Sequence, residues 1–421
     1  MTEPLARPKK KNPNARTRLP TLPPGLRSRS AHGLTRAAAE GVFEMQTCAD
    51  CGTVQYPPRE VCGHCLSEAL EWRPTASGGE LIATTTLRHS NDLYFRERLP
   101  WRVGTVRMDA GPSVVAHVHG DVGHDDGVDG KGTRVRLVLK LDRSGQAVLH
   151  ALPERNTPAM QDDPQMREAT CDPKYRRVLI TDGRSELGIA AARAMLDAGA
   201  SVVFLGDGKT WKSDPAFDRL TQSDERIQVV ELDVTDTDSV DRLAASIGGK
   251  VEIVVHTADH LRDGGVMSRR DVILAKDTME IKVFGMMRVA QAFGPGLCFR
   301  AADGSNNAVA WVNLLSIHAL TPLPARGAWS AAQAAALSVS QTLRAEFHGA
   351  GVRVVNVFHG PVEETWDQLT PPPKLAPGAV AKAVVKALQD GTEDAYVGDI
   401  AQELRTRLRE NHKAVERELR G

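Results

Sequence analysis

This sequence of 421 residues lacks several features that would assign a protein to a class at once. No run of about 18 apolar residues is present, so we predict no membrane-spanning helix. The N-terminus has no apolar segment of the kind found in secretory signals, and the cytoplasm is the expected location. The 53 basic side chains balance the 53 acidic ones, so the chain as a whole does not attract a polyanionic partner.

Aromatic residues and cysteines are also scarce. Aromatics make up 5% of the chain. Four of the six cysteines fall between positions 48 and 65, so they form one local cluster rather than a set of bridges spread over the chain. Cys171 and Cys298 lie outside this cluster, and we expect them to be ordinary thiols. No internal repeat is present.

Composition divides the N-terminal part of the chain into four segments. Residues 1–29 hold eight Lys or Arg against one acid, among several prolines, which predicts a disordered basic arm. Residues 30–75 begin with a short helix, for which Ser30 is the candidate N-cap, and then contain the cysteine cluster. β-Branched runs separated by Gly, Asp and Pro over residues 76–152 predict a small barrel or sandwich. The polar, Pro-rich residues 153–175 are predicted to be a linker.

The remaining residues, 176–421, alternate strand-like and helix-like patterns. Strands are predicted at 178–181, 201–205, 227–232, 253–256, 308–315 and 352–358. This alternation indicates a Rossmann-like α/β fold with a doubly wound parallel sheet.

The cysteine cluster predicts a metal site. Cys48, Cys51, Cys62 and Cys65 form two CxxC pairs separated by ten residues, a spacing that suits tetrahedral Zn²⁺ bound by four thiolates. Two disulfides are the alternative, but they are disfavoured in a cytoplasmic chain. Four protein sulfurs leave no open coordination position, so the zinc would be structural and would contribute on the order of 10 kcal/mol to folding.

Motifs around the cysteines carry a family resemblance. Tyr56-Pro57-Pro58-Arg59, Glu71-Trp72 and Gly78-Gly79-Glu80, together with the cysteine pairs, resemble the acyl-CoA-associated zinc-ribbon plus OB-fold family over about residues 30–152. The resemblance implies a rubredoxin-like zinc ribbon, then a small OB-fold barrel, in a non-catalytic partner of a thiolase-like enzyme.

Two questions about the barrel stay open at this point. The aromatics Tyr94, Phe95 and Trp101 either anchor the partner or pack in the barrel core. An OB barrel can also bind single-stranded nucleic acid through stacked aromatics in a positive groove. Residues 76–152 contain ten basic and nine acidic side chains, which argues against nucleic acid.

The C-terminal part resembles the short-chain dehydrogenase/reductase family over about residues 177–399. The motifs that carry this resemblance are Leu232-Asp233-Val234, the predicted strand before Ser316, and His359-Gly360-Pro361-Val362. The family's phosphate loop, Thr-Gly-x-x-x-Gly-x-Gly, aligns with residues 181–188, where Asp182 and Glu186 replace two glycines.

These two replacements predict an impaired cofactor site. A diphosphate must approach backbone N–H groups at a helix N-terminus without meeting a Cβ. Each carboxylate would oppose one phosphate charge by roughly 3 kcal/mol at an effective dielectric near 20. Arg184 would neutralise part of this charge, and the acids also suit the helix dipole. We assign no cofactor-binding residue, and NAD binding is doubtful.

The part of the predicted dinucleotide site that would hold the adenosine still carries two acidic residues. The resemblance implies that Asp233 would contact adenine and that Asp207 would hold a ribose hydroxyl and oppose a 2′-phosphate, which favours NAD over NADP. Both acids also suit strand-end turns.

The catalytic positions differ from the family pattern as well. Ser316, Trp329 and Gln333 occupy the spacing at which the family carries Ser, Tyr and Lys, and Lys282 lies where it carries Asn. An indole does not ionise in the working pH range, and Gln333 brings no charge. We therefore assign no catalytic residue. The alternative is that Lys282 or His256 has taken over proton transfer.

Together these patterns predict a non-catalytic accessory subunit of a thiolase-fold enzyme (thiolase, synthase or retro-aldolase) that acts on acyl-CoA. Its pseudo-dehydrogenase domain would form a homodimer or heterodimer through the helix of residues 331–347, with neither nucleic acid nor membrane as a partner. One alternative is an active NAD-dependent short-chain dehydrogenase/reductase acting on a 3-hydroxyacyl- or 3-oxoacyl-CoA. The other is an OB-fold nucleic-acid-binding protein.

Overall fold

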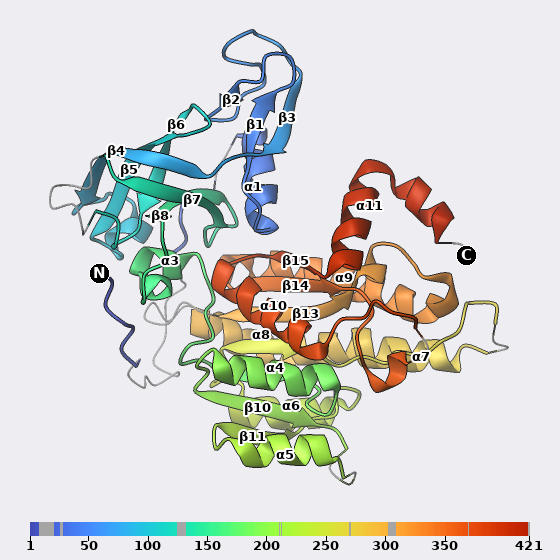
Figure 1. Cartoon of the computed structure of the whole chain (residues 1–421). Coiled ribbons are helices and arrows are strands. Elements are labelled where there is room, and N and C mark those ends of the chain that lie inside the picture. The colour runs from blue at the N-terminus through green and yellow to red at the C-terminus, as the bar shows by residue number, and fades with distance from the viewer. Residues whose placement is uncertain are drawn as a thin grey trace. The chain divides into compact units, whose positions relative to one another are not determined.

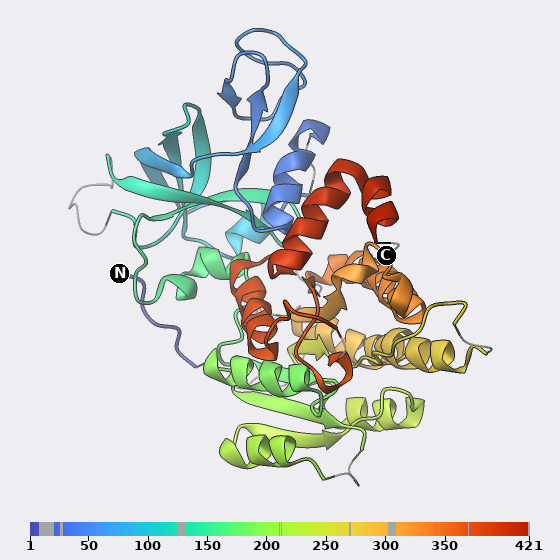
Figure 2. The same ribbon diagram turned by 45° about the vertical axis from the view of Figure 1, so that its right-hand side comes forward.

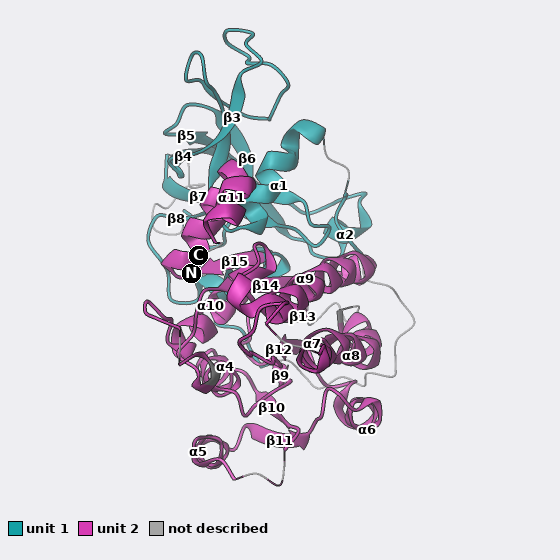
Figure 3. Cartoon of the chain, turned by 90° about the vertical axis from the view of Figure 1, so that its right-hand side faces the viewer, with its two compact units in different colours: residues 1–7, 21–171, 389–393 teal, residues 8–20, 172–388, 394–421 magenta. Residues whose placement is uncertain are grey.

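The computed structural model describes residues 1–7, 21–25, 28–123, 132–209, 211, 213–268, 271–301, 309–368 and 370–419. The chain forms two compact units, coloured separately in Figure 3. The first unit contains residues 1–7, 21–171 and 389–393, and the second is made mainly of residues 172–388 and 394–421. The predicted disordered arm falls partly on residues 8–20 and 26–27, which lie outside the described residues.

The first unit begins with a helix and a three-stranded antiparallel sheet (Figure 1). Its elements are α1 (His32–Ala39), β1 (Glu44–Cys48), β2 (Val54–Gln55) and β3 (Leu70–Pro74), with strand order β2-β1-β3. The prediction that Ser30 caps the helix is wrong. A 3₁₀ turn, Arg29–Ala31, precedes α1, so Ser30 lies inside that turn and its hydroxyl pairs with the Ser28 hydroxyl at 2.7 Å.

A closed five-stranded barrel follows, as the sequence predicted. Its strands, in the order β4-β5-β6-β8-β7, are β4 (Gly78–Leu87), β5 (Trp101–Met108), β6 (Ser113–Val118), β7 (Arg134–Leu141) and β8 (Ala147–Pro153). A short helix, α2 (Leu93–Arg96), connects β4 to β5. Side chains alternate along the strands: Val106 and Met108 are buried whereas Arg107 between them is exposed. The inward set, which includes Leu81, forms the core of this unit.

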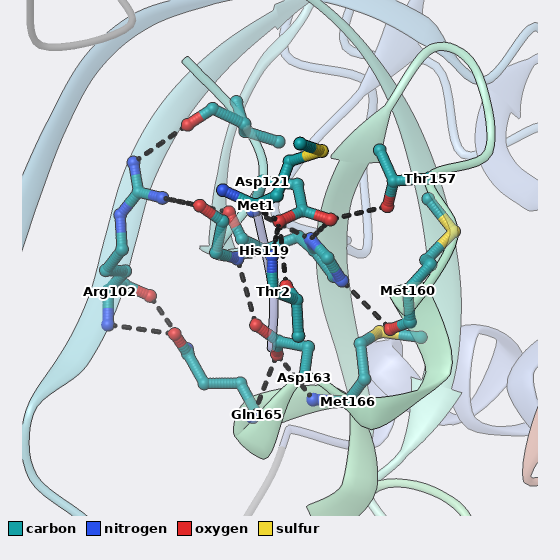
Figure 4. Close-up of polar contacts among 12 residues, drawn as sticks. Met1, Thr2, Arg102, His119, Asp121, Thr157, Met160, Asp163, Gln165 and Met166 are labelled. Carbon is teal, nitrogen blue, oxygen red and sulfur yellow. Dashed lines mark hydrogen bonds and ion pairs between the residues drawn. The ribbon is translucent and has the colours of Figure 1, made fainter. Parts of the chain in front are cut away.

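Polar contacts bind the predicted linker to the barrel (Figure 4). The segment contains a 3₁₀ turn, Met160–Asp162, and helix α3 (Pro164–Glu168). The Gln165 side chain accepts from the Arg102 backbone N–H at 3.0 Å and donates to the Arg102 carbonyl at 2.9 Å. Asp163 caps α3 and accepts from the Gly120 N–H at 2.9 Å. The segment up to Cys171 therefore belongs to the first unit.

The second unit contains a seven-stranded parallel sheet, which confirms the predicted doubly wound fold. The strands, in the order β11-β10-β9-β12-β13-β14-β15, are β9 (Arg177–Ile180), β10 (Val202–Asp207), β11 (Ile227–Glu231), β12 (Ile253–His256), β13 (Ala310–Ser316), β14 (Arg353–His359) and β15 (Asp394–Val397). The sequence pattern did not predict β15, because all four of its residues are only half-buried and it forms the edge of the sheet.

Helices cover both faces of this sheet (Figures 2 and 3). One face carries α4 (Glu186–Asp197), α5 (Pro215–Ser223) and α10 (Pro377–Asp390), and the other carries α6 (Thr237–Ile247), α8 (Gly285–Ala301) and α9 (Gly327–Phe347). The remaining helices are α7 (Ile273–Met279), continued into α8 by a π-helical turn, Glu280–Phe284, and α11 (Asp399–Glu418).

The central strands β12, β13 and β14 are buried along their whole length, as expected for parallel strands covered on both faces. Trp311 and Phe293 are fully buried in the core on the α8–α9 side. The carboxyl ends of these strands bring Ser316, His359 and the loop after His256 to one edge of the sheet, where ligands of doubly wound folds bind. Among the described residues, no helix combines the length and apolar character that crossing a membrane requires.

Candidate functional site

The four clustered cysteines meet at one point in the first unit. Cys48 ends β1, Cys51 lies in the turn before β2, and Cys62 and Cys65 come from the loop before β3. Their sulfurs all lie within 4.8 Å of one another, and the Cys48–Cys65 and Cys51–Cys62 sulfur pairs are each 3.6 Å apart. Four sulfurs around one tetrahedral zinc at about 2.3 Å would be about 3.8 Å apart. The donor set therefore fits a zinc ion, which these four side chains could hold.

The second unit has a cavity of about 660 Å³ at the carboxyl edge of its sheet. Residues from the predicted phosphate loop, adenosine end and catalytic positions line it, including Asp182, Asp233, Lys282, Ser316 and Trp329. The structure therefore brings together residues that are up to about 150 positions apart in the chain. Gln333 is fully buried beneath this lining. Asp207 is buried outside this lining.

The predicted phosphate loop forms the usual turn into α4. Ser185 caps the helix by accepting from the Gly188 N–H at 3.0 Å. A Cβ on Gly188 would lie 1.9 Å from the Asp182 carbonyl, so this remaining glycine of the motif is required by close packing. The Asp182 carboxyl group accepts from the Arg184 N–H at 3.1 Å, and burial raises its pKa.

Two further carboxyl groups gather at the first turn of α4. Glu186 accepts from both the backbone N–H (3.0 Å) and the hydroxyl (2.5 Å) of Thr365, which joins the helix to the loop after β14. Glu364 faces the Leu187 N–H, one of the free donors at the helix N-terminus. Burial, with the Asp259 and Glu186 carboxylates nearby, raises the pKa of Glu364 to about 8.

This arrangement determines what α4 can bind. The N-terminus of a helix that opens on such a cavity is the part of the fold that holds an anion. Here the carboxyl group of Glu364 faces the Leu187 N–H at the N-terminus of α4, where an anion would bind. The sequence pattern did not single out Glu364, because an acid in a loop after a strand is usually solvent-exposed.

At the adenosine end, Asp207 is held by Arg184. The guanidinium donates from Nε to Oδ1 at 2.5 Å and from an Nη to Oδ2 at 2.8 Å, and it stacks over Phe217 at 4.7 Å. Burial alone would raise the pKa of Asp207, but these bonds and one from the Lys209 N–H lower it. The Arg184 guanidinium therefore already bonds to both carboxylate oxygens of Asp207 that would otherwise bind a ribose hydroxyl.

Asp233 lines the cavity and also stabilises a turn. Its Oδ1 accepts from the Thr235 N–H at 2.9 Å and from the Thr235 hydroxyl at 2.7 Å. Of the two roles that the sequence left open, the structure shows the turn contact directly.

The catalytic positions form one connected network around Asp259. Its carboxylate accepts from the Trp329 indole N–H at 3.2 Å and from the Gln333 amide at 2.9 Å. The Gln333 carbonyl accepts from the Ser316 backbone N–H at 3.1 Å, and the Ser316 hydroxyl accepts from the His318 N–H at 3.2 Å. The three residues therefore meet at one place. Asp259 joins Trp329 to Gln333, and Gln333 bonds directly to Ser316.

Lys282 lies behind this network. Its ammonium donates to the Leu314 carbonyl at 2.8 Å and to the Ala258 carbonyl at 3.4 Å, and it is 4.0 Å from the Asp259 carboxylate. Burial lowers its pKa. Burial and the Lys282 charge also lower the pKa of His256 to about 3, so that ring is neutral at physiological pH.

Arg326 ties together the loops at the rim of the cavity. It donates to Asp263 at 2.6 Å, to Asp367 at 2.8 Å and to the Thr370 hydroxyl at 2.7 Å. The side chains of Arg326 and Asp367 are only 8% and 4% exposed. Asp367 also accepts from the Val362 N–H at 3.2 Å. Sequence analysis did not identify this cluster, because its members come from three separate loops without periodicity.

Comparison with known proteins identifies the second unit. Residues 176–370 match the profile described as short chain dehydrogenase. A short-chain dehydrogenase from Burkholderia cenocepacia, solved in complex with NADP, is 30% identical with a TM-score of 0.53, and the match covers 59% of this chain and 99% of that one. The chain belongs to the short-chain dehydrogenase family. The parallel sheet and the cavity at its carboxyl edge are thus those of this family.

The first unit of this short-chain dehydrogenase family member matches two further profiles. Residues 35–71 match the ChsH2 rubredoxin-like zinc ribbon domain, and residues 72–140 match the ChsH2 C-terminal OB-fold domain. The three matches together show a zinc ribbon and an OB-fold fused to a short-chain dehydrogenase domain, as the sequence motifs predicted.

Curated relatives match about half of this chain. A phenolphthiocerol/phthiocerol polyketide synthase subunit of Mycobacterium tuberculosis is 28% identical over 232 residues, which are 54% of this chain but 10% of that protein. The chain thus spans about a tenth of the length of that relative. An uncharacterised oxidoreductase of Staphylococcus epidermidis is 26% identical over 222 residues, covering 51% of this chain and 91% of that protein.

Proposed function

We propose that this chain is a non-catalytic accessory subunit of a thiolase-fold enzyme that acts on acyl-CoA, with its short-chain dehydrogenase domain serving as a dimerisation scaffold. The observation that carries the proposal is the network around Asp259, in which Trp329 and Gln333 are both hydrogen-bonded to one carboxylate. These two residues stand where a reductase of the family would carry its proton donor and its cation.

The chemistry of a carbonyl reductase needs a positioned proton donor whose pKa suits the working pH. The indole N–H of Trp329 does not ionise there, and the amide of Gln333 carries no charge. Lys282 lines the cavity but donates to the Leu314 carbonyl, and the Ser316 hydroxyl accepts from the His318 N–H. Trp329 and Gln333 therefore cannot supply the proton for a developing alkoxide, and the proposal assigns that role to neither Lys282 nor Ser316.

The cofactor side supports the same conclusion. A dinucleotide would place its diphosphate at the first turn of α4, where Glu364 faces the Leu187 N–H and Glu186 bonds to Thr365. Its ribose would compete with Arg184 for Asp207. These contacts compete with those that NAD would make, so the proposal includes weak or absent NAD binding.

We assign one structural Zn²⁺ to Cys48, Cys51, Cys62 and Cys65. With four thiolates, the metal would be closed to substrate and would hold the two CxxC turns together. Its role would be to stabilise the ribbon, whose three short strands are too small to form a core of their own.

The partner is inferred from the fusion of domains. The ChsH2-type ribbon and OB-fold resemble a family of partners of thiolase-like enzymes, and one curated relative is named as part of a polyketide synthase. Both support an enzyme of the synthase type that handles acyl thioesters.

The proposed scaffold surface lies on α8, the π-helical turn before it and α9. Phe284, Met287 and Phe299, spaced along one face, are 47%, 38% and 60% exposed. The exposed residues of α9 at 331, 334 and 338 are small (Ala, Ala and Ser), so a second helix could approach closely.

Phe299→Asp should convert the dimer to a monomer in analytical ultracentrifugation. Val229→Asp, at a residue 46% exposed on β11, should not.

The direct test is co-expression with the thiolase-fold enzyme encoded nearest to this chain, followed by size-exclusion chromatography and an activity assay. We expect one complex, with higher thiolase activity than the enzyme has alone. Separate elution of two proteins, with a thiolase that is fully active without this chain, would refute the proposal.

An active NAD-dependent reductase of a 3-oxoacyl-CoA is the second candidate function. Two observations favour it: the cavity of about 660 Å³ and the presence of Ser316 in its lining. Saturable binding of NADH, followed through nicotinamide fluorescence, would support this candidate over the first.

A further inference from the structure

A second cavity, of about 240 Å³, lies within the first unit. It is bounded by α2, β5, β6, β8, α3 and the segment 21–25. The residues that line it are Pro23, Pro24, Tyr94, Phe95, Trp101, His117, Asp142, Val148, His150, Gln165, Glu168 and Ala169. All of them belong to the first unit, so the cavity is a property of that unit alone.

Aromatic rings form much of its wall. Trp101 meets Phe95 edge-to-face, with ring centroids 5.5 Å apart, and meets the His117 ring at 5.2 Å. Tyr94 and Trp101 are each only 4% exposed, so they are not surface anchors for a partner. Such fixed edge-to-face packing holds the wall in place, which favours a preformed site.

The polar side chains of the lining are paired, with one exception. The Trp101 indole donates to His117 Nδ1 at 2.8 Å, the Tyr94 hydroxyl donates to Glu168 at 3.0 Å, and Gln165 bonds to the Arg102 backbone. Asp142 accepts from the Ser144 and Gln146 N–H groups at 2.8 and 2.9 Å.

The exception is His150. It is 2% exposed, and the described part of the chain gives its ring a contact with His117, at 5.1 Å, but no hydrogen bond. Burial, and then the neighbouring His117 and Lys140, hold the pKa of His150 well below 6.5, so the ring is neutral. A neutral imidazole carries one N–H donor and one acceptor nitrogen. A buried polar group of this kind costs free energy unless it finds a partner.

The rim of the cavity is held by the segment 21–25. The Ser144 hydroxyl donates to the Pro23 carbonyl at 2.5 Å, and the Thr21 hydroxyl donates to Glu97 at 2.7 Å. Arg98 donates to the Thr21 hydroxyl at 3.0 Å. Pro23 and Pro24 are thereby fixed over the aromatic wall.

Size and charge define the ligand. A cavity of 150 Å³ lined by apolar side chains binds benzene, so this one has room for about ten non-hydrogen atoms. The accessible lining is almost entirely apolar, and the acids in it are already bonded. A charged ligand would therefore lose its hydration without gaining a counter-ion.

We propose that this cavity binds a neutral, largely apolar molecule or group of about ten non-hydrogen atoms, whose single carbonyl or hydroxyl group bonds to His150. This site is separate from the dinucleotide cavity and from the cysteine cluster, and it does not depend on the identity of the partner enzyme.

Saturation-transfer NMR on the full chain tests this with three probes of similar size. Acetophenone has the carbonyl, cumene lacks it, and benzoate is charged. We expect acetophenone to bind saturably, about fivefold more tightly than cumene, as one hydrogen bond of about 1 kcal/mol implies. Benzoate should not bind.

Variants locate the site. Val148→Phe should abolish acetophenone binding by filling the cavity, and Val148→Met serves if the larger residue prevents folding. Val115→Phe, at a residue 62% exposed on β6, is the control that should bind normally. His150→Phe should bind acetophenone and cumene equally. The proposal fails if acetophenone gives no saturable signal, if benzoate binds as tightly, or if the folded Val148 variants bind like the wild type. If it fails while the thiolase complex forms, the proposed function is unaffected.

Discussion

The side-chain amide of Gln333 donates to the carboxylate of Asp259 at 2.9 Å. Gln333 is fully buried, and its carbonyl accepts from Ser316 on β13. Asp259 follows β12, so this one amide joins the ends of two neighbouring strands to helix α9. The Asp259 carboxylate also accepts from the Trp329 indole in the wall of the cavity. The proposal of a non-catalytic role rests on these two side chains, because neither an indole nor an amide ionises in the working pH range.

Restoring the catalytic pair alone should not restore activity. Trp329→Tyr with Gln333→Lys brings back a phenol and an ammonium, but Glu364 and Glu186 still lie at the first turn of α4. Adding Asp182→Gly, Glu186→Gly and Glu364→Ala should tighten NADH binding at least about tenfold, because carboxyl groups that oppose the diphosphate are removed. Nicotinamide fluorescence measures this. Equal NADH affinity in the two sets of variants would show that these acids do not limit binding.

Glu364→Gln should stabilise the protein at high pH. Burial raises the pKa of Glu364 from its ordinary value near 4.5 to about 8, so the folded state retains a proton that the unfolded state has lost. Between these two values stability falls as pH rises, and the loss is complete above about pH 8. The amide removes this loss, which is several kcal/mol at pH 9 and almost nothing at pH 4.

Thermal unfolding at these two pH values measures the effect. Glu363→Gln, at the exposed neighbouring position, is the matched control and should change neither melting temperature. If Glu364→Gln shifted the melting temperature equally at both pH values, the raised pKa would be wrong.

Arg326→Met should destabilise the second unit by about 3 kcal/mol, because it leaves Asp367 buried without its cation. Urea unfolding followed by circular dichroism measures the change. Arg242→Met provides the comparison, since Arg242 and Asp236 form a 4.0 Å pair in which both side chains are more than half exposed. That substitution should cost less than about 0.5 kcal/mol. Similar losses in the two variants would mean that Arg326 does not hold the rim loops together.

One zinc per chain should be found by elemental analysis. Cys48→Ser should lose the metal and the protease resistance of the ribbon, whereas Cys298→Ser, outside the cluster, should keep both. Stoichiometric zinc in Cys48→Ser would place the metal elsewhere.

The sequence predicted the architecture well because each unit has strong local signals. β-Branched runs placed a small barrel or sandwich over residues 76–152, and continuous apolar runs identified the buried strands of the parallel sheet. It missed β15, whose half-buried residues have no clear period, and it misplaced the cap of α1, because a 3₁₀ turn comes first.

The candidate site was only partly predictable. Motif spacing brought Ser316, Trp329 and Gln333 to one place, since the family pattern fixes their elements. It did not predict that Asp259 bonds to two of them, or that Glu364 turns toward α4, because both depend on contacts between loops far apart in the chain. The cavity beside His150 could not be predicted from the sequence either, because a cavity has no sequence pattern of its own.

The most direct test of the non-catalytic assignment is a single assay of the purified chain with NADH or NADPH and a 3-oxoacyl-CoA. The account predicts no saturable change in nicotinamide fluorescence at millimolar cofactor and no oxidation of the cofactor. Turnover that disappears in Ser316→Ala would contradict it and would make this chain a working reductase.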